Sequence, residues 1–260
     1  MNIAIIGGGN LGKSIAQGLL EHNFEARDIT VTRQKIELLS DLKERGVQIS
    51  NDNTVASQNA QVIIIAVKPY KISEILHEIN QVITSDKIII SVVSDFSIED
   101  IKNNISSSPS IIRAMPNTAT SVNESMTCLA SNNASQEDMA IVTNIFNSLG
   151  KTIEINETLM DAATVLGACG IAYVLRFIRG MIQGGIEIGF DAQTATQIAT
   201  QTVKGASELL LQKGNHPEAE IDKVTTPKGC TIAGLNEMEH QGFSSSLIKG
   251  IKTSFDSISK

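Results

Sequence analysis

The residues best suited to chemistry lie late in the chain, in a segment that reads VTTPKGCTIAGL at positions 224–235. Pro227 and Gly229 predict a turn, and the small residues after them have helical spacing. The first turn of a helix leaves backbone N–H groups unpaired, so such a start can hold an anion. Thr225, Thr226 and Thr231 add hydroxyl groups beside it. An ordinary proline and glycine entry into a helix would show the same generic pattern.

A second group of residues lies near the N-terminus, where Gly7-Gly8-Gly9-Asn10-Leu11-Gly12 follows a short apolar run. The spacing is G-x-G-x-x-G, which between a strand and a helix is typical of a dinucleotide site. Gly7 would permit the tight turn, Gly9 the approach of a pyrophosphate, and Gly12 close packing of helix on strand. We expect Gly7, Gly9, Asn10, Leu11 and Gly12 to bind the cofactor, with a purely structural glycine turn as the alternative.

The residues after the second apolar run indicate which dinucleotide to expect. An NAD site usually carries Asp or Glu there, but this chain reads Thr32-Arg33-Gln34-Lys35. The guanidinium of Arg33 can pair with a 2′-phosphate as a fork, and Thr32 can assist it. We therefore predict NADPH as the cofactor, with NADH possible. Solvated charge at a helix start is the alternative explanation of Arg33 and Lys35.

Two further loops follow apolar runs, Ala66-Val67-Lys68-Pro69 and the RAMPNT segment at positions 113–118. Proline stops a strand because it cannot donate to the ladder. Ligands of open α/β sheets bind beyond the carboxyl ends of the strands. Residues 66–69 are therefore candidates for cofactor binding and Asn117 for substrate binding, although both loops could be ordinary surface loops.

The elements that must position these residues alternate along the first half of the chain. Short β-branched runs predict buried strands at residues 3–6, 29–32, 62–67, 88–93 and 111–114. Apolar residues at helical spacing predict helices at residues 11–20, 35–45 and 72–82. Further strands at 126–130 and 152–155 flank a helix at 137–149. The alternation predicts an α/β fold of the Rossmann type, a doubly wound sheet over residues 1–156.

The second half, residues 157–260, predicts an all-α domain with helices at 159–190, 192–212 and 231–241. Glycines at 180, 184, 185 and 189 are costly inside helices unless something packs closely on them. Because so few helices make a thin core, we expect them to pack on another copy of the chain, as a homodimer or higher homo-oligomer. A monomeric helical cap on the sheet is the alternative.

Composition narrows the classes of partner. Hydrophobic residues make up 42% and charged residues 19% of the 260, as in soluble globular proteins. The net charge is −7 and no basic face is evident, so we expect no nucleic-acid binding.

Three cysteines without a C-x-x-C pair fit reduced thiols and provide no metal framework, so we expect no metal. The apolar stretch 171–188 contains Arg176, Arg179 and Glu187, so we expect no membrane span. The first residues lack the basic start of a signal peptide. We therefore expect a cytoplasmic protein.

The four motifs, the glycine fingerprint, AVKP, RAMPNT and VTTPKGCTIAGL, resemble those of the pyrroline-5-carboxylate reductase family and occur in the family's order along essentially the whole chain. The resemblance implies hydride transfer from NAD(P)H to the imine carbon of L-Δ1-pyrroline-5-carboxylate, which gives L-proline. It implies that Thr231 lies near the imine nitrogen and that Asn53 contacts the cofactor. Thr226 and the N–H groups of Gly229, Cys230 and Thr231 are then our candidates for binding the substrate carboxylate.

The chain departs from the family pattern at several positions. Lys228 stands where a second glycine is usual, Thr226 replaces the usual Ser, and Ala119 replaces a common Pro. Residues 167–173, GACGIAY, lack two hydroxyls and a proline of the family's SGSGPAY, which puts the helix geometry there in question. A reductase of a related cyclic imine acid and a non-catalytic NADP-binding regulator remain as alternatives.

Overall fold

The structure is a computed structural model that describes residues 1–22 and 24–258. They form two compact units, one made of Met1–Cys169 with Ile258 and the other of Gly170–Ser257. The division falls later than the predicted domain boundary at residue 156. The reason is that Met160 is buried in a small apolar cluster with Met115 and Ala130, so the chain just after residue 156 packs with the first unit.

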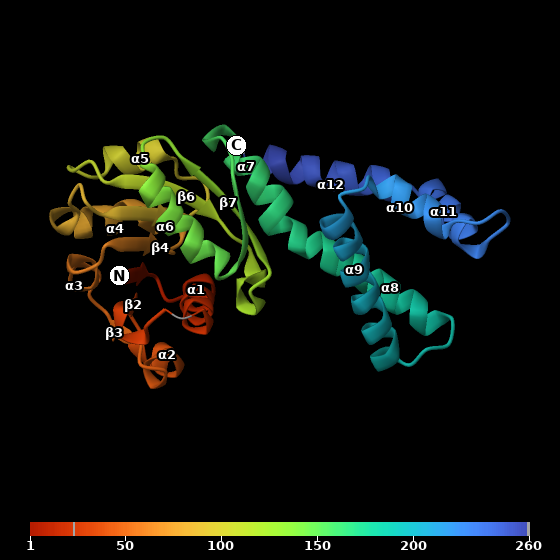
Figure 1. Cartoon of the computed structure of the whole chain (residues 1–260), viewed down its shortest axis with the longest axis horizontal. Helices are drawn as coiled ribbons and strands as arrows, with labels where there is room; N and C mark the ends of the chain where they lie inside the picture. Colours follow the sequence, from red (N-terminus) through yellow and green to blue (C-terminus); the bar gives the residue numbers. More distant parts are fainter. Residues whose placement is uncertain (23, 259–260) are drawn as a thin grey trace. The chain divides into compact units, whose positions relative to one another are not determined.

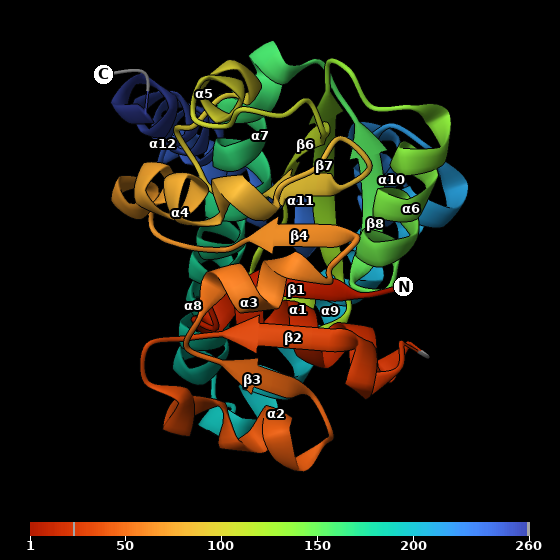
Figure 2. The same ribbon diagram turned by 90° about the vertical axis from the view of Figure 1, so that its left-hand side faces the viewer.

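The first unit contains an eight-stranded sheet in the order β3-β2-β1-β4-β5-β6-β7-β8 (Figure 2). The strands from β3 to β6 are parallel, β7 is antiparallel to β6, and β8 is parallel to β7. Their bounds are Ile3–Ile6 (β1), Ile29–Thr32 (β2), Gln48–Ser50 (β3), Val62–Ile65 (β4), Ile88–Ser91 (β5), Ser110–Met115 (β6), Ser125–Ser131 (β7) and Gly150–Glu154 (β8). The predicted doubly wound sheet is confirmed.

Helices cover both faces of this sheet, because the central strands are apolar on both sides. Side chains of α1, α2 and α6 pack on one face, and those of α3, α4 and α5 on the other. The helices are Asn10–Glu21 (α1), Ser40–Glu44 (α2), Asn53–Gln58 (α3), Ile72–Ile79 (α4), Ile98–Asn103 (α5), Gln136–Asn147 (α6) and Met160–Ala163 (α7) (Figure 1).

One predicted helix of this unit differs from the structure, and some short elements of the structure were not predicted. The helix predicted at 35–45 is a 3-10 turn, Ile36–Leu39, followed by the short α2. Strand β3, with three residues, and helices α3 and α5, with six each, were not predicted. Elements of this length contain too few residues to show a period of 2 or 3.6.

Glu157 ties the start of the C-terminal half to the sheet unit. Its Oε1 accepts the backbone N–H of Ile98 at 2.7 Å and lies 3.4 Å from Nη1 of Arg113, and its Oε2 accepts Nδ2 of Asn132 at 3.1 Å. Arg113 is 6% exposed, so its charge requires this carboxylate. One side chain thus joins β6, the start of α5 and the end of β7.

The helix predicted at 159–190 is interrupted. After α7, residues Thr164–Cys169 form a π-helix, which ends just before Ile171, the position where the family's proline is missing. In a π-turn each N–H pairs with the carbonyl five residues back, which can free a carbonyl for other donors. The carbonyl of Gly167 accepts Nδ2 of Asn117 at 3.2 Å.

The second unit consists of helices Gly170–Glu187 (α8), Ala192–Lys213 (α9), Pro217–Val224 (α10), Cys230–His240 (α11) and Phe243–Ile258 (α12), drawn from green to blue in Figure 1. Contacts between its distant residues include a hydrogen bond from Tyr173 Oη to Ser254 Oγ at 2.6 Å and the ring pair Phe177 and Phe243, whose centroids lie 6.0 Å apart. Within its described residues, only Ala195 and Ala199 count among the buried apolar side chains.

One helical run, Glu157–Glu187, is long and apolar enough to cross a membrane by length and composition. The expected absence of a membrane span therefore stays a prediction. Core helices of soluble proteins meet the same criterion.

Candidate cofactor and substrate sites

In the glycine loop between β1 and α1, two glycines are required by neighbouring backbone atoms and a third faces open space. Gly7 has φ +107°, and a Cβ there would lie 2.5 Å from the carbonyl oxygen of Ala66. A Cβ on Gly12 would collide with the carbonyl of Gly7, so the tight turn and the close packing predicted for these two residues are present. A Cβ on Gly9 would meet nothing within 4 Å. Packing within the protein therefore does not require a glycine at position 9. A ligand that approaches the backbone closely there would require one, because a side chain would stand in its way.

Helix α1 begins at Gly9 with no side-chain cap and no acidic residue in its first turn. The N–H groups at this start, from Asn10 to Gly12, are therefore open to an anion, and the helix dipole favours one there. By contrast, helices α3, α5, α6 and α9 each begin at a side chain that accepts a backbone N–H, namely Asp52, Ser97, Ser135 and Asp191. The start of α1 fits the pyrophosphate of a dinucleotide.

Arg33 lies beside this loop. Its Nη1 donates to the carbonyl of Gly8 at 2.7 Å, and its backbone N–H donates to Ser50 at 3.0 Å. The guanidinium is half-buried, and the hydrogen bond to Gly8 uses only part of its donors. A cation is thus fixed next to the glycine loop, where a 2′-phosphate could pair with it, whereas Lys35 is exposed.

The side chains of Thr32 and Asn53 form hydrogen bonds that hold the glycine loop. Thr32 is 1% exposed, and its Oγ1 accepts the N–H of Gly7 at 3.3 Å and donates to Oδ1 of Asn53 at 2.6 Å. Nδ2 of Asn53 donates to Oε2 of Glu78 at 2.9 Å. The predicted cofactor contacts of Thr32 and Asn53 remain predictions. Glu78 was missed, because nothing in the spacing of α4 distinguishes it from an ordinary surface residue.

Residues 66–69 follow the carboxyl end of β4, next to the glycine loop. The N–H of Ala66 donates to Ile6 at 2.8 Å, and Cγ1 of Val67 would lie 3.0 Å from a Cβ on Gly7. Lys68 and Pro69 are exposed, and Pro69 begins a 3-10 turn. The structure therefore brings Ala66 and Val67 to the glycine loop. Lys68 and Pro69 lie at the same carboxyl ends of the parallel strands.

Asn117, at the end of β6, uses its side chain to hold its own loop. Oδ1 accepts the N–H of Ala119 at 2.9 Å, and Nδ2 donates to Gly167 as described above. Its backbone N–H donates to Ser125 Oγ at 3.0 Å, and the residue is 8% exposed. These contacts explain why an asparagine occupies this position, and the predicted contact with substrate remains untested.

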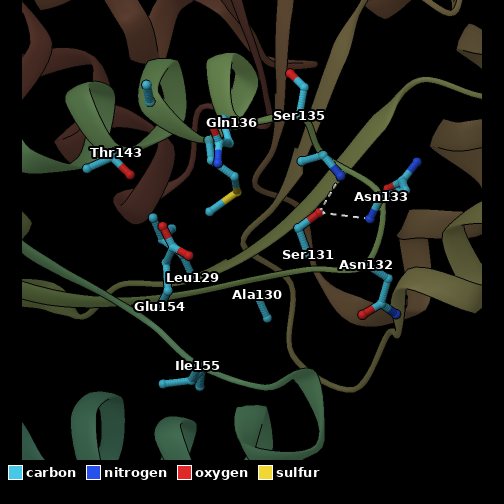
Figure 3. Close-up of a pocket in the computed structure, with 13 residues that line it drawn as sticks. Leu129, Ala130, Ser131, Asn132, Asn133, Ser135, Gln136, Thr143, Glu154 and Ile155 are labelled. Atoms are coloured by element: carbon cyan, nitrogen blue, oxygen red, sulfur yellow. Dashed lines mark hydrogen bonds between the residues drawn. The ribbon is translucent and has the colours of Figure 1, made fainter.

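A cavity of about 610 Å³ lies at the opposite end of the strands from the glycine loop (Figure 3). It is lined by the loop after β7, the first turns of α6, and Glu154 and Ile155. β7 runs antiparallel to β6 and pairs Ser131 with Ile112, so its end lies away from the carboxyl ends of the parallel strands. Ser131 Oγ accepts the N–H groups of Asn133 and Ala134. No predicted site residue lines this cavity, so it is not the candidate site.

In the second unit, the turn Thr226-Pro227-Lys228-Gly229 leads into α11. The N–H of Gly229 donates to the carbonyl of Thr226 at 2.9 Å, and Lys228 has φ +60°, as the third residue of a type II turn requires. A Cβ on Gly229 would lie 2.6 Å from Oγ1 of Thr226. The turn thus holds the Thr226 hydroxyl directly at the helix start.

Helix α11 has the same kind of start as α1. It begins at Gly229 without a side-chain cap, and its first turn contains no acidic residue. The N–H groups of Cys230 and Thr231 are therefore available, and both residues are exposed. The N–H of Gly229, which we also expected to bind the anion, is already used by the carbonyl of Thr226 inside the turn. The Thr225 hydroxyl donates instead to the Asp222 carbonyl at 3.1 Å. Thr226, Gly229, Cys230 and Thr231 are brought together, as an anion site of the predicted kind requires.

Groups of three or more His, Cys, Asp and Glu side chains that could hold a metal ion are not found among the described residues.

Comparison with known proteins gives two family matches. A model described as pyrroline-5-carboxylate reductase dimerisation matches residues 157–260, and one described as NADP oxidoreductase, coenzyme F420-dependent, matches residues 2–95.

Two Dictyostelium discoideum proteins, named pyrroline-5-carboxylate reductase 1 and 2, are 46% and 43% identical over 98% and 100% of this chain. The chain spans 48% of the length of the first, about half, and 92% of the second.

The solved structure of Plasmodium falciparum pyrroline carboxylate reductase with NADP bound has a TM-score of 0.90 and 26% identity, and the match covers 99% of this chain and 97% of that one. A pyrroline-5-carboxylate reductase from Coxiella burnetii gives 0.91 and 27%, with the same coverage. These likenesses extend over both units, including the glycine loop and the start of α11.

Proposed function

Because the chain belongs to the pyrroline-5-carboxylate reductase family, we propose that it reduces L-Δ1-pyrroline-5-carboxylate to L-proline with NAD(P)H. The relative that is 43% identical over the whole chain carries this proposal, since the match includes both helix starts with open N–H groups. The two alternatives from sequence, a six-membered-ring reductase and a non-catalytic regulator, are not favoured by these relatives.

The reaction adds a hydride to the imine carbon and a proton to the ring nitrogen. When bound, the reduced nicotinamide supplies the hydride. The space at Gly9 and the open N–H groups of α1 fit the pyrophosphate of such a cofactor. Arg33 would pair with a 2′-phosphate, which makes NADPH the preferred form.

The substrate is held by the start of α11. The N–H groups of Cys230 and Thr231, with the Thr226 hydroxyl, bind the carboxylate, and the hydroxyl of Thr231 orients the imine nitrogen. An unperturbed threonine hydroxyl is a weak acid, so solvent supplies the proton. The protein's main contribution is placement of the reacting atoms at about 3–3.5 Å.

The protein acts as a homodimer or higher homo-oligomer, without a nucleic-acid or membrane partner, in the cytoplasm. The family model described as dimerisation supports the assembly, and the exposed apolar side chains of the second unit support an interface there. A second copy covering these helices also accounts for the apolar run at Glu157–Glu187 without a membrane.

The direct test is turnover. Purified protein is mixed with pyrroline-5-carboxylate and NADPH, and the loss of reduced-nicotinamide absorbance is followed together with the formation of proline. We expect stoichiometric conversion. Well-folded protein that binds NADPH but does not consume it with this substrate would refute the proposed reaction, and turnover of a six-membered cyclic imine acid alone would reassign it.

A further inference from the structure

We infer that Glu78, on the exposed side of α4, is a positioning residue for the cofactor loop and acts on it through Asn53 and Thr32. The inference rests on the proposed use of NAD(P)H. It concerns a residue outside every sequence motif, which neither follows a strand nor belongs to the glycine fingerprint.

Three hydrogen bonds in series connect Glu78 to the loop. Oε2 of Glu78 accepts Nδ2 of Asn53 at 2.9 Å, Oδ1 of Asn53 accepts Oγ1 of Thr32 at 2.6 Å, and that hydroxyl accepts the N–H of Gly7 at 3.3 Å. The members come from α4, α3, β2 and the glycine loop, so the series crosses four elements.

The carboxylate sets the direction of the whole series. An ionised carboxylate only accepts hydrogen bonds, so the amide of Asn53 must turn its NH₂ group toward Glu78 and its oxygen toward Thr32. The Thr32 hydroxyl must then donate to Asn53, which leaves its lone pairs for the N–H of Gly7. Without Glu78, the amide of Asn53 has two orientations of similar energy. The hydroxyl of Thr32 would then donate to the amide oxygen in one orientation and accept from the amide NH₂ group in the other.

The end of the series is the most constrained part of the loop. Gly7 has φ +107°. Thr32 binds both Gly7, through its hydroxyl, and Gly8, whose N–H donates to the Thr32 carbonyl at 2.6 Å. Thr32 is 1% exposed and cannot find water partners instead. A loop fixed at Gly7 and Gly8 presents Gly9 and the α1 start to the cofactor in one conformation, which lowers the entropy cost of binding.

The test compares Glu78→Ala with Glu78→Gln and with a matched control, Glu74→Ala. Glu74 is exposed on α4 one turn earlier and belongs to none of the hydrogen bonds described above. We expect Glu78→Ala to weaken NADPH binding about three- to tenfold, the range for one hydrogen bond. In turnover the KM for NADPH should rise more than kcat falls. Glu78→Gln, whose amide oxygen can still accept Nδ2 of Asn53, should recover most of the affinity, and Glu74→Ala should match the wild type.

A double-mutant cycle with Thr32→Val separates a series of linked bonds from local destabilisation. If the bonds act in series, removing the Thr32 hydroxyl abolishes most of the effect of Glu78→Ala, whereas independent effects would add. The thermal midpoint, measured in parallel, should be the same for Glu78→Ala and Glu74→Ala.

The inference is wrong if wild-type protein binds NADPH and Glu78→Ala binds it within about twofold as tightly, if the two single effects add, or if Glu74→Ala loses as much affinity. Failure of the proposed function gives a different result, since the wild type itself would then not turn over pyrroline-5-carboxylate.

Discussion

At the scale of single residues, Lys228 is the side chain whose backbone conformation is hardest to account for. It lies at φ +60°, a region that costs a bulky residue about 1–2 kcal/mol and glycine nothing. The turn into α11 explains why the family usually has glycine there. What the lysine provides in return is not shown by any contact in the structure.

Replacing Lys228 tests this strain. Lys228→Gly should raise the thermal midpoint by roughly 1–3 °C, because relief of the left-handed strain exceeds the added freedom of the unfolded chain. Lys228→Ala, which keeps a Cβ, should not raise it. The comparison is made by calorimetry, and a lower midpoint for Lys228→Gly than for Lys228→Ala would contradict this account. A raised KM for the substrate in both variants would place the ammonium at the carboxylate.

Thr231 is the residue on which the proposed chemistry depends most. Thr231→Ala should lower kcat/KM for pyrroline-5-carboxylate about ten- to a thousandfold, the range for loss of one positioned donor. NADPH affinity should change little. Thr231→Ser, which retains the hydroxyl, should keep much of the activity, and Thr225→Ala should have a smaller effect, since that hydroxyl is bonded to Asp222. Wild-type kinetics in Thr231→Ala would reject the assigned role.

Arg33 is the residue that we propose sets a preference for NADPH. Arg33→Ala removes a charge-assisted pair, so we expect NADPH binding to weaken about ten- to a hundredfold and NADH binding far less. Dissociation constants for both cofactors, with Lys35→Ala as the control for general charge, check this. Equal losses for the two cofactors would mean that Arg33 stabilises the loop through Gly8 and does not contact a 2′-phosphate.

At the scale of elements, hydrogen bonds at both ends of a short helix stabilise it in the fold. Helix α3, which presents Asn53, has its first turn capped by Asp52. At its other end the buried Lys87 donates to three carbonyls, those of Ser57, Gln58 and Ala60. Burial lowers the pKa of Lys87. A six-residue helix that would not be stable alone is thereby fixed at both ends.

The N-terminal cap of α5 predicts a dependence of stability on pH. Hydrogen bonds from the Ser97 hydroxyl and N–H, and then the nearby Arg113, lower the pKa of Asp100 below the ordinary value of an aspartate side chain. A lowered pKa in the folded state contributes stability above the unfolded-state value, and this is lost as pH falls through the folded-state value.

We therefore expect the free energy of unfolding to fall below about pH 4 and to fall less steeply in Asp100→Asn. Urea unfolding between pH 6 and 3 measures both slopes. The exposed Glu99, replaced by Gln, serves as the control. Identical slopes for Asp100→Asn and the wild type would exclude this carboxylate as a contributor.

At the scale of the whole molecule, the second unit exposes many large apolar side chains, more than a monomer would keep in water. On α8, Leu175 is 59% exposed, and a Cβ on Gly180 or Gly184 would meet nothing within 4 Å. Such a helix surface suits close approach of another helix, in agreement with the dimerisation model matched by residues 157–260.

Leu175→Glu tests this surface. A charge placed in an apolar interface should shift the protein to a lower oligomeric state, measured by light scattering after size exclusion. Leu38→Glu, at a 45% exposed leucine of the sheet unit, should leave the mass unchanged. If Leu175→Glu keeps the wild-type mass while remaining folded, α8 does not form the interface around this residue.

The sequence by itself determined the parts that depend on local spacing and residue type. The β-branched runs fixed the strands from β1 to β6 apart from β3, and G-x-G-x-x-G located the α1 start, because one period or one glycine pattern suffices for each. The string from Thr226 to Thr231 predicted a second candidate anion site, at the start of α11, for the same reason. The family resemblance came from these motifs as well.

Only the tertiary structure decided what joins distant residues. It showed that Thr32 and Asn53 bond each other and Glu78, that Asn117 holds Gly167, and that the chain near Met160 packs with the sheet unit. It also revealed the left-handed Lys228 and the π-helix after α7. A hydrogen bond between residues more than twenty positions apart depends on the packing of whole elements, and no local pattern in the sequence specifies that packing.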